Sequence, residues 1–173
     1  LNQPRLILLE NIGTVSEPAF QVVNSDWLEL SSTFSSSNPS PTFGDFDNDG
    51  DTDIFVGGSV IPGNYPGFYP SRLYRNDNGI LVEDNTTDFS KVGLITGATS
   101  GDFDKDGKTD LIVVGEWTGV MYFKNMGGVF KKENIGNVTS LFQSLTSGDI
   151  DNDGDIDLIV GNFGLNSQYQ ASA

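Results

Sequence analysis

The sequence predicts an all-β protein assembled from four-stranded antiparallel blades of a β-propeller. An acidic motif, D-x-D-x-D-G-x-x-D, occurs three times, at residues 45–53, 102–110 and 149–157. The motifs begin 57 and 47 residues apart, and each interval also contains a hairpin pattern. Four short strands repeated at this spacing are typical of propeller blades.

An apolar run follows each acidic motif directly, at residues 54–57, 111–115 and 158–161. The runs are apolar at consecutive rather than alternate positions, which indicates strands that are covered on both faces. Inner strands that lie between neighbouring blades have this property. A β-sandwich with three acidic turns would explain the strands, but it would not explain why they repeat.

Turn-forming residues between two apolar runs predict hairpins over residues 4–23, 72–82 and 120–131. One blade would then consist of a short strand before the acidic motif, the apolar run after it, and the two strands of the next hairpin. The chain thus reads as repeats of one four-stranded unit.

We expect a single propeller fragment over residues 1–173. Its parts are a hairpin of two outer strands (4–23), a blade (40–86), a second blade (97–133) and a hairpin of two inner strands (143–161). These parts make a partial propeller of about three blades, whereas closed propellers have roughly four to eight. The fragment is therefore expected to pack against the remaining blades of a larger parent protein. The alternative is that other copies of the chain close the ring.

The spacing of the acidic motif predicts a cation site. Aspartates at positions 1, 3 and 5 can direct carboxylates to one centre, and glycine at position 6 permits a sharp turn. Position 7 can offer its backbone carbonyl, and the aspartate at position 9 completes the shell. An EF-hand is excluded because position 12 is valine in all three copies. Asp-Gly and Asn-Asp pairs also form ordinary turns, but three copies with identical spacing favour a metal.

Oxygen ligands suit Ca²⁺, and they also suit Mg²⁺ and Mn²⁺. Without a cation, the clustered carboxylates would repel one another at close range. The formal net charge of the chain is −15, and 14 of its acidic residues lie in the three motifs. We expect about three Ca²⁺ ions per chain.

Composition excludes several classes of function. The 173 residues include no cysteine and no histidine, which rules out a disulfide framework, a zinc finger, and Ser-His or Cys-His catalysis. The nine Lys and Arg residues are scattered, which argues against nucleic acid as a partner. No apolar stretch is long enough to span a membrane. Because calcium is abundant outside the cytosol, we expect an extracellular or cell-surface protein.

The unit Phe-Gly-Asp-Phe-Asp-x-Asp-Gly-x-x-Asp, followed by an apolar run and Gly, resembles the FG-GAP/VCBS repeat. This repeat is a calcium-binding propeller blade that also occurs in the head domains of integrin α-subunits. Residues 114–117 and 161–167 are similar to VCBS-repeat proteins of bacteria, so the resemblance favours a secreted or surface-attached bacterial protein. It covers roughly residues 40–170. It implies a seven- or eight-bladed parent with Ca²⁺ in several of its loops.

Carried over position by position, the resemblance implies five ligands in each motif, with the seventh position contributing its carbonyl. They are Asp45, Asp47, Asp49, Asp51 and Asp53; Asp102, Asp104, Asp106, Lys108 and Asp110; and Asp149, Asp151, Asp153, Asp155 and Asp157. Lys105 and Lys108 depart from the acidic pattern and are expected to weaken the second site modestly.

A ligand surface is expected on the face opposite the calcium loops. The long connection 59–70 carries Tyr65, Phe68 and Tyr69, and Trp117 lies in the corresponding short link 116–119. These aromatic residues could form a platform for a carbohydrate or a protein partner. The alternative is that they only pack the loop against its own blade.

Three functions are consistent with the sequence. The first is a calcium-stabilised extracellular binding or adhesion module. The second is part of a propeller-type polysaccharide lyase or hydrolase, for which Glu116 is the one exposed candidate, since the aspartates are committed to metal. The third is a purely structural spacer. We expect the chain not to be an enzyme.

Overall fold

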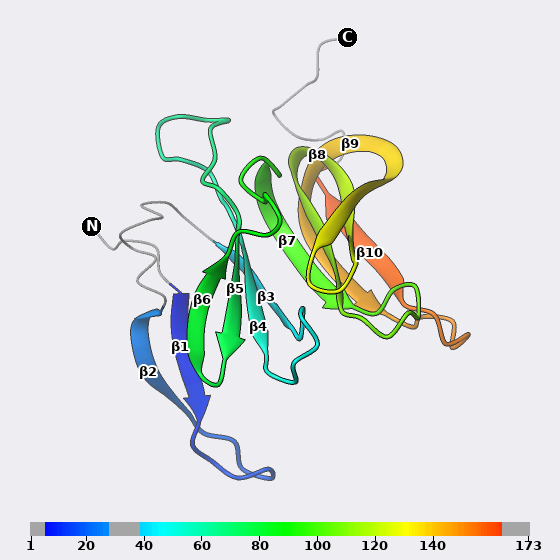
Figure 1. Cartoon of the computed structure of the whole chain (residues 1–173). Helices are drawn as coiled ribbons and strands as arrows, with labels where there is room; N and C mark the ends of the chain where they lie inside the picture. The colour runs from blue at the N-terminus through cyan, green and yellow to red at the C-terminus, as the bar shows by residue number, and fades with distance from the viewer. Residues whose placement is uncertain (1–5, 28–38, 164–173) are drawn as a thin grey trace.

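The computed structural model describes residues 6–27 and 39–163, and the regular structure in those ranges is entirely β-strand (Figure 1). The same ranges contain no helix that could span a membrane. The strands are β1 Leu6–Asn11, β2 Phe20–Trp27, β3 Ser40–Gly44, β4 Asp53–Gly57, β5 Arg72–Asp77, β6 Ile80–Asp84, β7 Leu94–Gly101, β8 Asp110–Asn125, β9 Phe130–Gly148 and β10 Asp157–Asn162.

The first blade is the antiparallel sheet β3-β4-β5-β6. All five residues of β4 are buried, as the consecutive apolar run predicts. Strands β5 and β6 are joined by Asn78 and Gly79, which have φ angles of 52° and 91°. Positive φ at both central residues is the requirement of a tight hairpin turn, which Asn-Gly meets at little cost. The predicted four-stranded antiparallel unit is confirmed.

The second blade differs from the prediction in its strand limits. Strand β8 is a single assigned strand of 16 residues, where the sequence predicts two strands and a short link. The backbone N–H of Asn125 donates to Oδ1 of Asp110 over 2.7 Å, although a straight strand of that length would span about 50 Å. Strand β8 therefore folds back on itself. The reversal lies at residues 116–119, where its register with β9 shifts and Trp117 has a φ of 60°.

Strand β9 also serves two units. Its first part pairs with the returning arm of β8, and its last part pairs with β10. The sequence predicts separate strands here, ending at residue 133 and starting again near residue 143. The chain instead passes from the outer edge of the second blade to the inner edge of the third unit within one strand, with Gly136 at a φ of 73°.

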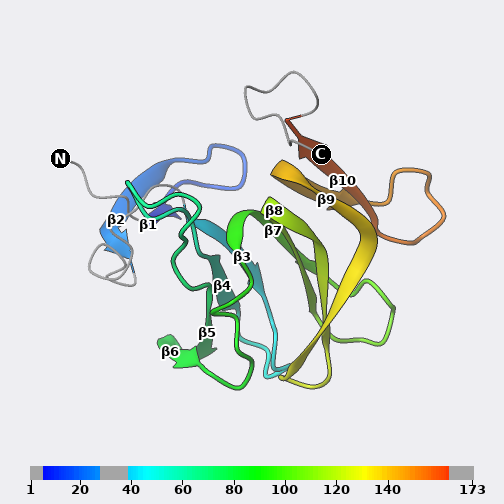
Figure 2. The ribbon, with the colours of Figure 1, turned by 90° about the horizontal axis from the view of Figure 1, so that it is seen from above.

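The inner strands of successive units lie side by side, as Figure 2 shows from above. Ser100 of β7 donates to the carbonyl of Phe43 in β3. On the other side of β7, the hydroxyls of Thr99 and Ser147 are 2.9 Å apart. The partners in these contacts are separated by about one repeat in the sequence. The described strands thus form an open arc of propeller-like blades and not a closed ring.

The main hydrophobic core lies between the first and second blades. Phe89, in the connection from β6 to β7, is 3% exposed and contacts three aromatic rings. Its ring centroid lies 5.3 Å from that of Phe55, 5.2 Å from that of Phe123 and 5.7 Å from that of Phe130. The contacts with Phe55 and Phe130 are edge-to-face and that with Phe123 is tilted, and such ring contacts hold the two sheets together beyond simple burial of area. The connection between blades is therefore part of the core.

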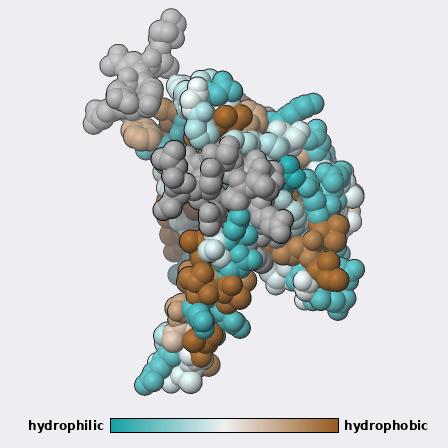
Figure 3. Space-filling model, turned by 90° about the vertical axis from the view of Figure 1, so that its left-hand side faces the viewer, coloured by the Kyte–Doolittle hydropathy of each residue, from teal (hydrophilic) through white to brown (hydrophobic). Residues whose placement is uncertain are grey.

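Strands β1 and β2 form a separate two-stranded sheet beside the first blade. Residues 4 and 5 of the predicted hairpin lie outside the described residues, and β2 continues to Trp27, beyond the predicted end at residue 23. Leu6 packs against Ile54 and Val56 of the first blade. Farther along the hairpin, apolar side chains are exposed (Figure 3). They include Ile7, Leu9, Phe20, Val22 and Val23.

Candidate metal centres

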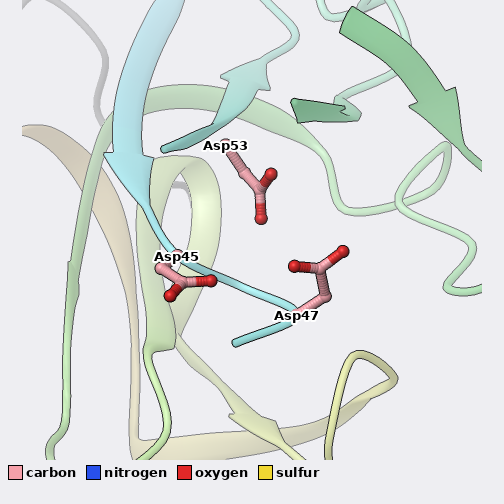
Figure 4. A group of neighbouring side chains, drawn as sticks. All are labelled: Asp45, Asp47 and Asp53. Carbon is pink, nitrogen blue, oxygen red and sulfur yellow. The ribbon is translucent and has the colours of Figure 1, made fainter. Parts of the chain in front are cut away.

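The three acidic motifs form the loops β3–β4, β7–β8 and β9–β10, which we call acidic loops 1, 2 and 3. All three lie at the same end of the blades, the lower end in Figure 1. In each loop, one carboxylate oxygen from positions 1, 3 and 9 lies within 4.8 Å of the others. The triads are Asp45, Asp47 and Asp53; Asp102, Asp104 and Asp110; and Asp149, Asp151 and Asp157. Figure 4 shows the carboxylates of the first triad directed toward a common space.

The first aspartate folds each loop around its own carboxylate. Asp45 accepts a hydrogen bond on Oδ1 from the N–H of Asn48 at 2.7 Å, and one on Oδ2 from the N–H of Gly50 at 3.1 Å. The fourth and sixth positions both have positive φ, which Asn and Gly tolerate best. Loop 2 has Lys105 at its fourth position, with a φ of 59°.

The ninth aspartate is buried where the loop meets the sheet. Asp53 is fully buried and accepts hydrogen bonds from the backbone N–H groups of Phe46 at 2.8 Å and Asn76 at 2.9 Å. Burial raises the pKa of Asp53 above its ordinary value, although these two hydrogen bonds act in the opposite direction. Asp110 is also fully buried and has equivalent bonds to Phe103 and Asn125. A neighbouring cation would stabilise the charged form of such carboxylates.

The residues present fit a hard divalent cation. The triads consist of carboxylate oxygens, which Ca²⁺ and Mg²⁺ prefer. In loop 1, Oδ1 of Asp47 is buried without a hydrogen-bond partner among the described residues. A buried acceptor without a donor is costly unless something else satisfies it. A bound cation would do so.

The fifth and seventh positions lie outside the triads. The fifth-position carboxylates of Asp49, Asp106 and Asp153 accept the N–H of the residue two positions later, at 2.8, 3.1 and 2.8 Å. At the seventh position, Asp51 accepts the N–H of Asn78 at 2.8 Å, and Lys108 contacts Asp106 at 3.0 Å. These contacts stabilise the turn, and the proposed ligand roles of both positions stay predictions.

Two basic residues that the sequence reasoning missed accompany loops 1 and 2. Arg75 Nη1 lies 2.9 Å from Oδ2 of Asp47. Lys124 Nζ forms an ion pair with Asp104 and lies 3.4 Å from Oδ2 of Asp106. In each of the two blades, a basic residue directly precedes an asparagine near the end of the third strand. This pattern is the sequence signal that could have identified them.

In loop 3, the basic partner is a lysine side chain that comes from loop 2. Nζ of Lys105 forms an ion pair with Oδ1 of Asp155, and this contact raises the pKa of the lysine. Both side chains are about two-thirds exposed. The departure from the acidic pattern at position 105 therefore links two neighbouring acidic loops.

The four predicted aromatic residues divide into two pairs. Tyr65 and Trp117 are exposed, and the indole Nε1–H of Trp117 donates to the hydroxyl of Tyr65 across the two blades. Phe68 and Tyr69 are half-buried. Phe68 forms a β-bridge with Val60, and Tyr69 packs against the first blade, so this pair holds the loop.

The comparisons with known proteins agree with the repeat. A family model for the FG-GAP-like repeat matches residues 45–113 and 102–160. Each match contains two acidic loops and the strands between them, and together the matches cover more than half of the chain. The search among curated proteins found no match. On the evidence of the repeat, its blades and its family model, the chain belongs to the FG-GAP-like repeat family.

Proposed function

We propose that the chain is a calcium-stabilised extracellular binding module for a protein or glycan ligand. FG-GAP-like repeats are typically extracellular, and they are parts of propeller-type binding modules. The observation that supports the metal is the recurrence of one carboxylate triad in all three acidic loops. The proposal assigns metal binding to one end of the blades and ligand binding to the other end.

The role proposed for the metal is structural. In loop 1, Asp53 starts β4 and also accepts the N–H of Asn76 in β5. Asp110 of β8 accepts the N–H of Asn125 in the same way. A cation bound to these carboxylates would therefore fix the loop to the second and third strands of its blade. It would also offset the repulsion within each triad. Both effects would stabilise the folded chain.

Calcium titration by calorimetry, combined with thermal melting in calcium and in EDTA, tests this function. We expect about three ions per chain and a large fall in melting temperature after chelation. Asp47→Asn, Asp104→Asn and Asp151→Asn should each remove about one ion, because each changes the third position of one loop. Asp88→Asn is the control, because Asp88 is an acidic residue outside the loops. Absence of binding, or binding that leaves the melting temperature unchanged, would refute the proposal.

A further inference from the structure

We propose that the cavity at the junction of the three units, remote from the acidic loops, binds a neutral saccharide. This inference rests on the proposed binding function and names the ligand class and the residues that would contact it. The cavity has a volume of about 280 Å³, near the lower end of small-molecule sites. That size is suitable for one sugar unit with its neighbours in solvent.

All three units contribute to this cavity. Ser40 begins β3 and Ser59 follows β4, whereas Thr96 and Glu116 come from β7 and β8. Gln143 comes from the part of β9 that belongs to the third unit. Each of these residues lies at or near the strand end that is remote from its acidic loop, the upper end in Figure 1. A ligand here would contact all three units at once.

The polar groups of the cavity suit hydroxyl groups. Oε1 of Glu116 accepts a hydrogen bond from Nε2 of Gln143 at 3.2 Å, which orients both side chains. The second carboxylate oxygen of Glu116 has no hydrogen-bond partner among the described residues. Carboxylate, amide and hydroxyl groups together can both accept from and donate to the hydroxyls of a sugar.

Trp117 adds an exposed aromatic side chain at the reversal of β8, next to Glu116 in the chain. It follows Glu116 directly and has a φ of 60°, a conformation that is rare for a bulky residue and that glycine would adopt without strain. Strain of this kind at an exposed position points to a use for the side chain. Trp117 is 45% exposed and Tyr65 is 49% exposed, and a hydrogen bond joins their side chains. Such rings combine an apolar face with a polar edge, which suits the two sides of a sugar ring.

Charge and composition narrow the ligand class. Among the described residues, Glu116 is the only ionisable one that lines the cavity, so a sulfated, phosphorylated or uronic acid ligand would meet repulsion without a basic partner there. Hydrolysis of a glycosidic bond commonly uses two carboxyl groups, and the described residues that line the cavity contribute one. The site is therefore assigned to binding a neutral glycan and not to cleaving one.

An array of neutral and acidic oligosaccharides, probed with the calcium-loaded chain, tests this site. We expect the chain to bind neutral glycans on the array and not to bind acidic ones. Calorimetry with a retained oligosaccharide should then show at least about tenfold weaker binding for Glu116→Gln and for Trp117→Gly. The glycine variant removes the ring and also relieves the positive φ, so its melting temperature should not fall. Phe20→Ala, which removes an exposed aromatic ring from β2, is the control and should bind normally.

The failure of this inference can be distinguished from failure of the proposed function. If calcium stabilises the chain but the chain binds no neutral glycan, the saccharide site is overturned, whereas the proposal of a calcium-stabilised module is not. Retention of acidic glycans alone, or of lysine-rich peptides whose binding is lost in the same two variants, would also overturn it. Weakened glycan binding in Trp117→Gly with normal binding in Phe20→Ala would support it.

Discussion

Arg75 and Lys124 occupy the same position in successive blades. Each directly precedes the asparagine whose N–H binds the buried ninth-position aspartate, and each forms an ion pair with the third-position aspartate of its loop. Their surroundings differ, because the side chain of Arg75 is 17% exposed and that of Lys124 is 30% exposed. The two loops therefore share one arrangement, in which a side-chain cation already offsets part of the negative charge.

Removal of the Lys124 ammonium should tighten calcium binding at loop 2. The ammonium pairs with Asp104 and repels an arriving cation, and Lys124→Met abolishes both effects while keeping an apolar side chain of similar length. We expect up to about a fivefold gain in affinity, the scale of one exposed ion pair. Calorimetric titration of the variant measures it.

Lys131→Met is the matched control for this change. Lys131 is also an exposed lysine, and it pairs with Glu133 on β9 outside the acidic loops. Its loss should leave all three calcium affinities unchanged. If Lys124→Met weakens binding at loop 2, the lysine would be a support for the bound metal and not a competitor.

Removal of Arg75 should destabilise the fold more than removal of Lys124. Its guanidinium contacts Asp47 and Asp84, and Nη2 donates to the carbonyl of Gly128 in the second blade at 2.6 Å. Arg75→Met would leave the carboxylate of Asp84, which is 7% exposed, without its cation. Breaking such a pair costs about 3 kcal/mol when fully buried, so we expect about 2 kcal/mol here.

Urea unfolding in EDTA measures this loss of stability. Metal must be absent so that changes in calcium affinity do not contribute to the result. Arg72 lies in β5 like Arg75 but pairs with Glu83 of β6, and Arg72→Met serves as the control with a smaller effect. Equal free energies of unfolding for Arg75→Met and Arg72→Met would contradict the larger contribution assigned to Arg75.

Asp84 makes part of this stability depend on pH. Burial raises the pKa of Asp84, but hydrogen bonds from Thr86 and Arg75 outweigh burial, and the pKa lies below its ordinary value of 3.8. A lowered pKa in the folded state means that the carboxylate stabilises the fold above pH 3.8 and loses this effect as the pH falls through the folded-state pKa. We expect the difference in unfolding free energy between the native chain and Asp84→Asn to shrink below that pH. A difference that is constant from pH 7 to about pH 3 would contradict this assignment.

The features that the sequence predicted are those encoded locally. The three acidic loops fold around their own first aspartate, and Asn78-Gly79 forms its turn from two adjacent residues. The reversal of β8 falls at the predicted short link, because the flanking strands must return within the same blade. In each case the contacts lie within one loop or one hairpin, so spacing along the chain is sufficient to predict them.

The contacts that sequence reasoning missed join different units. Arg75 bonds to Gly128, which is 53 residues away, and Phe89 packs against rings from both blades. Such contacts depend on how far neighbouring sheets twist and approach, which no single segment determines. The course of β9 from one unit to the next is of the same kind. The cavity beside Glu116 was missed for this reason, because its lining comes from three units.

Substitution of Lys105 tests whether one acidic loop changes the calcium affinity of the next. Its place in loop 2 is taken by Asn48 in loop 1 and Asn152 in loop 3, and all three residues have φ angles near 60°. Lys105→Asn should therefore relax the backbone of loop 2, since asparagine tolerates this conformation better than lysine. The same change removes the cation that pairs with Asp155 in loop 3. We expect tighter calcium binding at loop 3 as well as at loop 2. Calorimetry in Asp151→Asn and Asp104→Asn backgrounds separates the two loops.

Lys91→Asn, which changes a lysine outside the acidic loops, is the control and should alter neither affinity. If Lys105→Asn affects loop 2 alone, the ion pair between the loops has no energetic consequence for the metal.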